Sequence, residues 1–472
     1  MASGHLRSQK DDRKAVNEAH VAIRAPGALP LLGHALSLFR RPLGFLATLA
    51  NHGDLVRIRV GPLDAVVICD PTLTDQVLRN DRTFDKGGPI YNRMEELTGN
   101  NVATCPHAQH RRQRRLVQPA LRSSRLPDYQ PRMIEQIDKV IGNWRDDQII
   151  DAPATMYRIA ARVLFATMFG SKVSDETLDE LVDDITVVMG AVTRRAAMPT
   201  LVNAIPTPAN RRYNRAHSRL QRHVDSILSE DHAGRGDNDT LLSMLLAARD
   251  DPASAAGGGQ PLTKDEVKDN LRIFLLGGID TTANVLCWAL HLLTEHPRIQ
   301  RRLHSEIGAV LGENPDFNVH ASSPAPAMVD NVITETLRLY PPGWLLTRTA
   351  TTDTVLGGHA IQAGTTVIYS PYIIHRRADL YPDPERFDPD RWDQADRDRV
   401  RPGTFVAFGG GPRRCVGESL ARLEAALVLS TIISRWRVCT VPGPPVAPSA
   451  GLVLGPKQLQ IRITPWTNPE LD

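Results

Sequence analysis

The spacing of apolar and polar residues along the chain predicts mostly helices. Between about Pro71 and Gly312, apolar residues recur at helical intervals, and the breaks between these runs are polar or rich in glycine. One helix should be far longer than the others, because it begins at a capping box, Thr263 to Glu266, and meets no proline before Pro297. Its apolar residues extend around most of its circumference, so we expect it to cross the middle of the molecule.

Short strands are predicted on both sides of this helical region. A hairpin pattern covers residues 55–69, and several strand-like runs cover residues 345–369, just after Pro341-Pro342. One more helix is expected from about Gly417 to Arg435, and a last strand lies near residues 458–463. The predicted fold class is therefore mainly α with a minor antiparallel β region (α+β).

The chain has 472 residues, whereas domains usually have about 100–200 residues. Because the long central helix would tie both halves together, we expect a single domain over residues 25–465. Residues 1–24 would form a polar tail without fixed structure, and residues 466–472 a short C-terminal tail. No stretch resembles a signal peptide or a span of ~18 uninterrupted apolar residues. We therefore expect a soluble, cytoplasmic protein without a membrane anchor.

Charge and composition exclude some classes of protein. The chain has 56 Lys and Arg against 53 Asp and Glu, a formal net charge of +3. A dedicated nucleic-acid or membrane-surface protein usually carries a strong basic excess, so we expect no nucleic-acid partner. The basic residues are almost all arginine, since only eight are lysine.

One cysteine differs from the other four. The five cysteines are far apart and form no Cys-x-x-Cys pair, which argues against a disulfide framework and a zinc site. Cys415 lies between a glycine-rich turn and an apolar helix, with Arg413 and Arg414 beside it. A helix N-terminus and nearby positive charges stabilise an anion, so we expect a thiolate at neutral pH. A thiolate without a base or a second cysteine suits metal binding, and a structural cysteine is the alternative.

The pattern Phe-x-x-Gly-x-Arg-x-Cys-x-Gly, from Phe408 to Gly417, resembles the haem-binding signature of the cytochrome P-450 family at every fixed position. The resemblance implies that Cys415 is the axial ligand of the haem iron, and that Arg413 reaches a haem propionate. It also implies haem b as cofactor, O2 as co-substrate, and the family's triangular fold, with the haem between the long helix and the Cys415 helix. The expected haem contacts in this loop are Phe408, Gly409, Arg413, Cys415 and Gly417.

The long helix contains Gly277-Gly278-Ile279-Asp280-Thr281. Two glycines inside a helix cost about 1 kcal/mol each relative to alanine, which suggests that a ligand approaches the backbone. An acid–threonine pair alone would more often be a cap or a solvated face. The segment is, however, similar to the family's oxygen-activation motif. This similarity implies that Asp280 relays protons and that Thr281 supplies the hydroxyl that steadies the oxygen intermediate.

Glu335 and Arg338 lie three residues apart, on one helical face, which alone indicates only a surface ion pair. Together with Arg386 they look like the family's Glu-x-x-Arg motif and its partner arginine. The resemblance implies a buried, structural network that locks the Cys415 loop in place.

Further basic residues are assigned by the same resemblance. His110 and Arg114 lie on one helical face and should bind one haem propionate, and Arg348 should bind the other. The remaining arginines of the same run would face outward and form a docking surface for an acidic electron carrier; they are Arg111, Arg112 and Arg115. No flavin or nucleotide segment is fused to the chain, so NAD(P)H electrons should arrive indirectly, through a ferredoxin reductase and a ferredoxin. We expect a monomer.

The substrate pocket is predicted to be apolar. The pocket candidates are Ile90, Tyr91, Gly277, Trp344 and Leu345, with Leu97, residues 188–192, Ile273 and residues 452–454 as further positions. None of them is charged, which fits a lipophilic small molecule.

Three runs also resemble bacterial terpenoid oxidases of the pentalenene and epi-isozizaene oxygenase type; they cover residues 111–121, 206–213 and 369–374. This similarity implies a monooxygenase for a terpenoid in secondary metabolism. The alternatives are another lipophilic substrate (a fatty acid, steroid or polyketide), a haem-thiolate isomerase or peroxygenase, and a non-enzymatic haem sensor or carrier. The acid–threonine pair argues against an isomerase or a peroxygenase.

Overall fold

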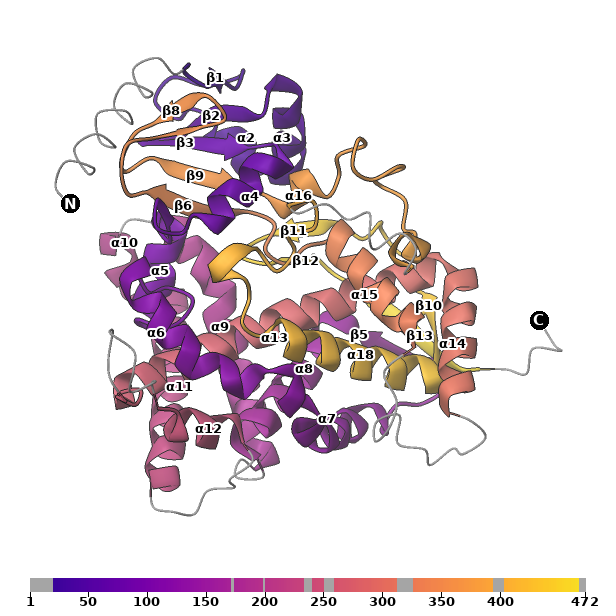
Figure 1. The fold of residues 1–472 in the computed structure, drawn as a ribbon. Helices are drawn as coiled ribbons and strands as arrows, with labels where there is room; N and C mark the ends of the chain where they lie inside the picture. The colour runs from indigo at the N-terminus through magenta and orange to yellow at the C-terminus, as the bar shows by residue number, and fades with distance from the viewer. Residues whose placement is uncertain are drawn as a thin grey trace.

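The structure is a computed structural model that describes residues 20–170, 174–197, 200–232, 240–249, 259–311, 326–393 and 403–466. The described elements form a three-cornered body, with the largest β-sheet at one corner and helices filling most of the rest (Figure 1). The predicted α+β fold class is confirmed, since helices dominate and the sheets are small.

The helices before the central one are short or of medium length, except for two long ones that precede it. They are α2 (Ala35–Arg40), α3 (Pro42–Leu49), α4 (Pro71–Arg79), α5 (Pro89–Thr98), α6 (His107–Val117), α7 (Leu126–Ile141), α8 (Ala152–Phe169), α9 (Asp175–Ala197), α10 (Thr200–Ala204), α11 (Pro208–His232) and α12 (Leu241–Ala247). The central helix and those after it are α13 (Lys264–Glu295), α14 (Pro297–Leu311), α15 (Ala327–Leu339), α16 (Pro371–Ile374) and α18 (Glu418–Arg435).

The largest sheet has six strands in the order β1-β2-β3-β9-β6-β4. These strands are β1 (Ile23–Arg24), β2 (Leu55–Val60), β3 (Leu63–Ile68), β4 (Phe84–Asp85), β6 (Leu346–Ala350) and β9 (Thr366–Tyr369). The pairs β1–β2 and β3–β9 are parallel, and the other three pairs are antiparallel. The sheet is therefore mixed, because strands from distant parts of the chain join the predicted hairpin.

The predicted hairpin forms, but its turn is tighter than expected. Val60 pairs with Leu63, so only Gly61 and Pro62 make the turn. Gly61 has φ +60°, a conformation that glycine adopts without steric cost. The second strand consequently begins at Leu63, two residues earlier than the pattern of apolar residues predicted.

The smaller sheets lie beside the helices. One contains β5 (Gln148–Asp151), β10 (Trp436–Thr440) and β13 (Gln460–Pro465), and the others are the pairs β7–β8 and β11–β12. The strands of these pairs are β7 (Thr354–Leu356), β8 (His359–Ile361), β11 (Pro448–Ala450) and β12 (Leu454–Pro456).

Helix α13 crosses the centre of the molecule, as predicted (Figure 1). Both hydrogen bonds of the capping box are present: the Glu266 N–H donates to the Thr263 hydroxyl, and the Thr263 N–H donates to the Glu266 carboxylate. The helix is long and apolar enough to cross a membrane by length and composition, but more than half of its apolar stretch is buried inside the protein. It is therefore a core helix, covered by α8, α15 and α18.

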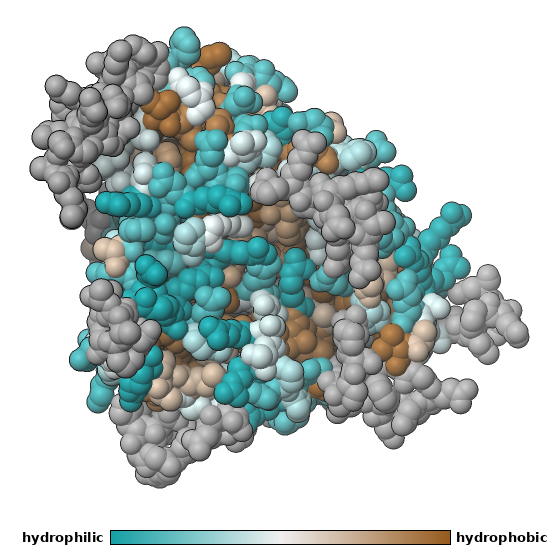
Figure 2. All heavy atoms as spheres, in the orientation of Figure 1, coloured by the Kyte–Doolittle hydropathy of each residue, from teal (hydrophilic) through white to brown (hydrophobic). Residues whose placement is uncertain are grey.

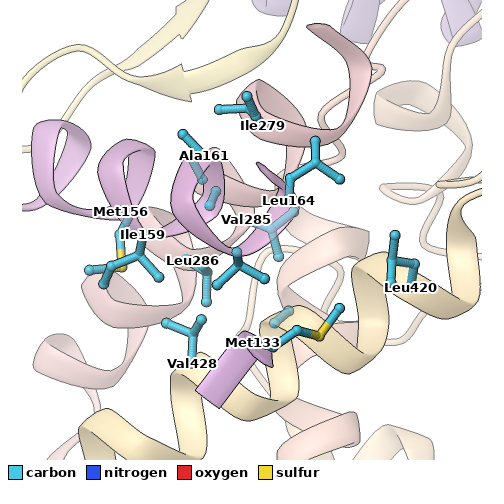
Figure 3. Close-up of a cluster of buried hydrophobic side chains, with 14 of the residues drawn as sticks. Met133, Met156, Ile159, Ala161, Leu164, Ile279, Val285, Leu286, Leu420 and Val428 are labelled. Carbon is cyan, nitrogen blue, oxygen red and sulfur yellow. The ribbon is translucent and has the colours of Figure 1, made fainter. Parts of the chain in front are cut away.

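The core is continuous around α13. Figure 3 shows side chains from four helices in contact there: Met133 from α7, Met156 and Leu164 from α8, Leu286 from α13 and Val428 from α18. Truncation of one such leucine to alanine typically costs about 2–5 kcal/mol of stability. The packing of α8 and α18 on α13 thus fixes the positions of the segments that carry the candidate site.

Glu335 and Arg338 on α15 form an ion pair that is fully buried, with both side chains 0% exposed. Arg338 Nε and Nη2 donate to the two carboxylate oxygens of Glu335, each at 2.8 Å. Arg338 Nη1 also donates to the carbonyls of His375 and Pro384. Because both charges are multiply hydrogen-bonded, their burial is tolerated.

The predicted role of the Arg386 side chain is wrong. That side chain is 67% exposed, and only the Arg386 carbonyl takes part in the network, by accepting a bond from Arg338 Nη2 at 3.1 Å. Arg391 completes the network instead, with its Nε 3.3 Å from Glu335 Oε1, and the indole N–H of Trp392 donates to Glu335 Oε2 at 2.8 Å. The reason is local geometry: a 3-10 turn at Pro389–Trp392 packs against α15.

His375 connects this network to the segment that leads into the Cys415 loop. Its Nε2 accepts a hydrogen bond from the Val406 N–H at 2.9 Å, and its ring stacks on Phe405. Burial and the nearby Arg338 lower the pKa of His375 to about 3, so the imidazole is neutral and can accept this bond.

A pair of variants tests the corrected network. Arg391→Ala removes charged hydrogen bonds to a buried carboxylate and should lower the unfolding free energy by about 1.5–3 kcal/mol. Arg386→Ala removes only an exposed side chain and should change it by less than about 0.5 kcal/mol. Urea denaturation followed by far-ultraviolet circular dichroism measures both. Equal losses in the two variants would contradict this assignment.

Candidate active site

A cavity of about 400 Å³ lies between α13 and α18. Residues of α13, α15 and α18 and the segment from Ala407 to Gly417 form much of its wall, and Leu164 of α8, Val285 and Leu420 contribute apolar surface (Figure 3). Three basic residues lie close together on the wall: His110, Arg114 and Arg413. The site is thus an apolar chamber with a basic edge.

The Cys415 loop is held in a tight conformation by its backbone. The Cys415 N–H donates to the Phe408 carbonyl at 2.9 Å, and Gly409 and Gly411 have positive φ. A Cβ atom on Gly411 would lie 2.2 Å from the carbonyl oxygen of Leu78 on α4. Gly411 is therefore required by the close approach of a neighbouring helix, whereas Phe408, Gly409 and Gly417 line the cavity.

The ionisation of Cys415 depends on more than the helix end and the arginines beside it. Burial raises the pKa of the Cys415 thiol, and the charge of Glu418 acts in the same direction. The hydrogen bond from the Gly417 N–H and the positive charges of Arg114 and Lys86 lower the pKa, but they do not outweigh burial. A coordinated metal deprotonates a thiol outright, so a thiolate here would depend on metal binding.

Arg413 is buried and paired with two carboxylates. Its Nε donates to Asp81 at 3.1 Å, its Nη2 donates to Asp85 at 2.7 Å, and its Nη1 donates to the Cys105 carbonyl at 2.8 Å. Nη1 also lies 4.0 Å from the Cys105 sulfur, and a guanidinium has five N–H groups, so at least one of them is left for a further anion. Arg413 therefore both fixes the loop against residues 81–105 and reaches the cavity.

His110 and Arg114 both line the cavity, but they differ in their interactions. Arg114 Nη1 donates to the carbonyls of Pro412 and Arg414, on either side of Arg413, so its guanidinium clamps the loop. Burial, with the charges of Arg413 and Arg114, lowers the pKa of His110 to about 3. His110 is therefore a neutral hydrogen-bonding group at physiological pH.

Lys86 is a functional residue that the sequence reasoning missed. It lines the cavity, and its Nζ donates to the Tyr91 hydroxyl at 2.7 Å. Burial and the charges of Arg348 and Arg413 lower the pKa of Lys86 well below its usual value. Cations this close together are unfavourable without an anion beside them.

A signal for Lys86 was present in the sequence. Lys86 is one of only eight lysines in an arginine-rich chain, and two glycines follow it. A Cβ atom on Gly87 would lie 2.4 Å from the hydroxyl of Thr349, and the Gly87 carbonyl accepts a bond from Thr347. These glycines therefore let the Lys86 segment lie directly against the strand that carries Arg348.

Thr281 and Asp280 of α13 point to different surroundings. Thr281 lines the cavity, and its hydroxyl donates to the Gly277 carbonyl at 2.6 Å. Asp280 lies away from the cavity wall, where its Oδ1 accepts a bond from Asn284 at 3.0 Å. Burial raises the pKa of Asp280 to about 6. A buried carboxyl that titrates near neutrality is suited to proton transfer.

The two glycines of α13 serve different structural purposes. Gly277 lines the cavity, and no atom lies within 4 Å of the position that a Cβ would take. A Cβ on Gly278 would lie 2.8 Å from Leu164 Cδ2 on α8. Only Gly277 thus leaves room for a ligand, while Gly278 allows close helix packing.

Comparisons with known proteins agree with this geometry. The sequence profile of the family named Cytochrome P450 matches residues 24–463. The chain belongs to the cytochrome P450 family. It is accordingly an oxidoreductase of the haem-thiolate type that uses O2.

Two curated relatives from Streptomyces cover almost the whole chain. The pentalenene oxygenase of Streptomyces avermitilis is 40% identical over 449 residues, which are 95% of this chain and 98% of that protein. The cyclooctat-9-en-7-ol 5-monooxygenase of Streptomyces melanosporofaciens is 40% identical over 421 residues, 89% of this chain and 90% of that protein.

Solved structures show the same fold. The cytochrome P450DA haem domain has a TM-score of 0.83 and 22% identity, and the match covers 95% of this chain and 98% of that one.

The residues of this P450 suit a haem. Arg348 is 1% exposed, and its Nε and Nη1 atoms have no hydrogen-bond partner in the described part of the structure. Orphaned donors in a buried cluster of cations fit an anionic group such as a carboxylate. No group of three or more His, Cys, Asp and Glu side chains suited to a bare metal ion occurs among the described residues. A single thiol on an apolar cavity wall fits a cofactor that supplies the other iron ligands itself.

Most of the residues that were predicted to contact the substrate do not line the cavity. Gly277 and Ile273 line the cavity of this P450, but Ile90, Tyr91, Trp344 and Leu345 do not. The indole of Trp344 is buried against another core cluster and donates to the Gly451 carbonyl. Leu345 packs against that cluster, and Tyr91 is the partner of Lys86. The apolar side chains on the wall instead include Val102, Leu121, Leu164, Leu241, Ile273, Phe274 and Val285.

Arg112 is not part of an open docking surface. Its side chain is 19% exposed and forms an ion pair with Glu266, the capping residue of α13. Arg111 and Arg115 line a hollow on the surface, together with His107 and Arg122, and this hollow shares His110 and Arg114 with the cavity.

Glu424 is a second residue that the sequence reasoning missed. It lies on α18, lines the cavity and is 3% exposed, and its Oε1 has no hydrogen-bond partner in the described part of the structure. Burial raises the pKa of Glu424 well above its usual value, so burial favours the protonated form of the carboxyl. The only sequence signal was a glutamate on an otherwise apolar helix.

This burial predicts a pH-dependent effect on stability. Because the folded state holds the Glu424 proton while the unfolded state releases it above about pH 4.5, the contribution of Glu424 to stability falls as pH rises. Glu424→Gln should therefore raise the thermal unfolding midpoint, and by more at pH 8.5 than at pH 5.5.

Glu306 of α14 provides a control. Its side chain is 37% exposed and pairs with Arg302 at 3.1 Å, so Glu306→Gln should not give the larger gain at high pH that is expected of the Glu424 variant. Calorimetry at both pH values measures the midpoints, and parallel profiles for the Glu424 variant and the wild type would exclude the buried neutral carboxyl.

Proposed function

We propose that this P450 is a haem b monooxygenase that inserts one oxygen atom from O2 into a terpenoid in secondary metabolism. The observation that carries the proposal is 40% identity, over almost the whole chain, to an enzyme named for pentalenene. The enzyme would act in the cytoplasm as a monomer, with NAD(P)H electrons passed on by a ferredoxin reductase and a ferredoxin. The hollow lined by Arg111, Arg115 and Arg122 is a candidate site for the acidic carrier.

Each part of the cofactor would have a partner in the chain. Cys415 Sγ would hold the iron, and the Gly417 N–H would donate to that sulfur. Arg348, Lys86 and His110 would bind the propionates, together with the remaining N–H of Arg413. When bound, the haem would supply activation of O2 and oxidation of a C–H bond.

The chain itself would deliver protons to the cavity. The Thr281 hydroxyl donates its hydrogen to the Gly277 carbonyl, which leaves the lone pairs of Oγ1 to accept a hydrogen bond on the cavity side. Asp280 is the adjacent residue, and the pKa of its carboxyl is raised to about 6. Asp280 would therefore hold a proton for part of the time near neutral pH and pass it toward Thr281.

The substrate side of the cavity suits a hydrocarbon skeleton. Its wall is formed mostly by leucine, isoleucine, valine and phenylalanine side chains, and charged groups are gathered at the basic edge and at Glu424. Burying a polar group without a hydrogen bond is costly, so such a wall favours ligands with few polar groups. A fatty acid would need a partner for its carboxylate on this wall.

Binding spectra test the substrate class. The purified holoprotein should give a saturable low-spin to high-spin change with sesquiterpene or diterpene hydrocarbons. Lauric acid and a steroid should bind at least tenfold more weakly. A change produced by lauric acid or the steroid alone would overturn the terpenoid assignment while leaving the monooxygenase assignment intact.

The assignment of Cys415 as the iron ligand can be tested separately from the substrate class. The reduced protein with carbon monoxide should show the absorbance band of a thiolate ligand, and Cys415→Ser should remove it. A band that survives this substitution would contradict Cys415 as the ligand.

Variants of α13 test the proton path. Asp280→Asn should lower product formation by about 100-fold, which is typical for loss of a general acid. In the wild type, product formation should rise as pH falls through about 6, because Asp280 becomes protonated there. The Asn variant should lack this pH dependence.

Thr281→Ser and Thr281→Ala provide the matched pair. Serine keeps the hydroxyl and should retain product formation, whereas alanine should consume NAD(P)H with little product. Product yield per NAD(P)H measures this difference, and equal yields in the two variants would exclude a role for the hydroxyl.

A further inference from the structure

A buried segment between α5 and α6 forms part of the cavity wall. We call residues 98–105 the wall segment, and its Val102 and Ala103 line the cavity. The outer face of this region is polar: Figure 2 shows mostly hydrophilic residues where α5 and α6 lie in Figure 1. Val102, by contrast, is 5% exposed. The polar side chains of the wall segment that are buried as well are Thr98, Asn101 and Thr104.

The wall segment is held together by its own hydrogen bonds. Asn101 Nδ2 donates to the Thr98 hydroxyl at 2.8 Å and to the Gly99 carbonyl at 3.0 Å. Asn101 Oδ1 accepts from the Ala103 N–H at 3.0 Å, and the Thr104 hydroxyl donates to the Gly99 carbonyl at 2.8 Å. Loops usually run over the surface and move more than the elements that they connect. These bonds instead give the wall segment a defined shape of its own.

Asn270 of α13 ties the wall segment to the central helix. The Asn270 side chain is fully buried, and its Oδ1 accepts a hydrogen bond from the Val102 N–H at 3.1 Å. Its Nδ2 donates to Gln113 Oε1 at 3.2 Å and to the Glu266 carbonyl at 2.7 Å. A buried amide is tolerated when its polar atoms have partners. One of these partners is the backbone of a residue that lines the cavity.

Two further contacts fix the same arrangement. Gln113 Nε2 on α6 donates to the Asn100 carbonyl at 3.1 Å, so the wall segment is bonded to α6 as well as to α13. The Asp269 carboxylate accepts from the Asn100 N–H at 2.9 Å. A Cβ atom on Gly99 would collide with this carboxylate. The wall segment therefore lies directly against α13, without space for a side chain at position 99.

The central helix also carries other parts of the cavity wall. Ile273, Gly277 and Thr281 line the cavity and follow Asn270 within about three turns of α13. Since Val102 is bonded to Asn270 through its backbone, Val102 keeps one position relative to these residues. The wall segment then acts as a fixed wall and not as a lid that moves aside.

We propose that Asn270 is a positioning residue that makes the wall segment a rigid template, and that this template selects ligands by their shape. Asn270 does not line the cavity, so it acts on a ligand through Val102 and Ala103. In an apolar pocket, one methylene group is worth about 10–200-fold in selectivity, and a wall that yields loses this selectivity. The proposal rests on the haem site at Cys415 and is independent of the terpenoid assignment.

Binding of a chiral ligand to the holoprotein tests the proposal. The two enantiomers of 1-(1-phenylethyl)imidazole, a nitrogen ligand of haem iron, have the same polarity and differ in shape. The wild type should bind one enantiomer about tenfold more tightly than the other. Asn270→Leu keeps the branched side chain but removes its hydrogen bonds, so the two dissociation constants should come within about twofold of each other. Titrations followed by the absorbance of the haem measure both constants.

Gln300→Leu provides the matched control. Gln300 is another buried amide that bonds backbone groups: its Nε2 donates to the carbonyls of Leu293 and Val438, and its Oε1 accepts from the Val438 N–H. It lies on α14 and does not line the cavity. This variant should lose stability but keep the enantiomer ratio of the wild type.

A second variant acts within the wall segment itself. Thr104→Val keeps the shape of the side chain and removes the hydroxyl that bonds to Gly99, so it should also lower the enantiomer ratio. It decides the test if Asn270→Leu fails to fold. The amide of Val102 should exchange its hydrogen slowly in the wild type and faster in Asn270→Leu, as measured by mass spectrometry.

Several results would overturn the proposal. They are a wild type that binds both enantiomers equally, an Asn270 or Thr104 variant that keeps the wild-type ratio, and a Gln300 variant that loses it. Exchange of the wild-type Val102 amide within seconds would overturn it too. None of these results bears on the terpenoid assignment, which the hydrocarbon titrations measure, or on the iron ligand, which the carbon monoxide spectrum measures.

Discussion

The buried ion pair between Glu335 and Arg338 is the interaction on which the geometry of the site depends. Arg338 holds the carbonyls of His375, Pro384 and Arg386, and Glu335 accepts bonds from Arg391 and Trp392. Breaking one partner of such a pair would leave an uncompensated buried charge, which typically costs about 3–5 kcal/mol. Since His375 in turn fixes Val406, the position of the cysteine loop follows from a charge pair on another helix.

Charge is distributed unevenly around the cavity. Cations gather at one edge, where Lys86 and Arg348 raise the local positive potential and depress proton affinity. Elsewhere on the cavity wall, burial favours the neutral form of the Glu424 carboxyl, and burial raises the pKa of Asp280, which does not line the cavity, to about 6. The low polarity of the cavity thus favours binding of an anion beside the cations, and it favours the uncharged forms of the Glu424 and Asp280 carboxyls.

The sequence reasoning succeeded where the determinant is local. The capping box of α13 and the run from Phe408 to Gly417 each lie within about ten residues, so their spacing carries the information. It failed where tertiary packing decides. Whether Arg386 or Arg391 reaches Glu335 depends on a 3-10 turn, and the burial of Trp344, Lys86 and Glu424 depends on segments far away in sequence.

The contact between Gly411 and Leu78 has a consequence for how such proteins can be recombined. A methyl group at position 411 would meet the Leu78 carbonyl at 2.2 Å, so α4 and the cysteine loop must be kept in one relative position. The backbone at Leu78 and the backbone at Gly411 are therefore matched to each other in this fold. A chimaera with a relative will keep its cysteine aligned only if both segments come from the same parent, or if the backbone at Leu78 follows the same path in both parents.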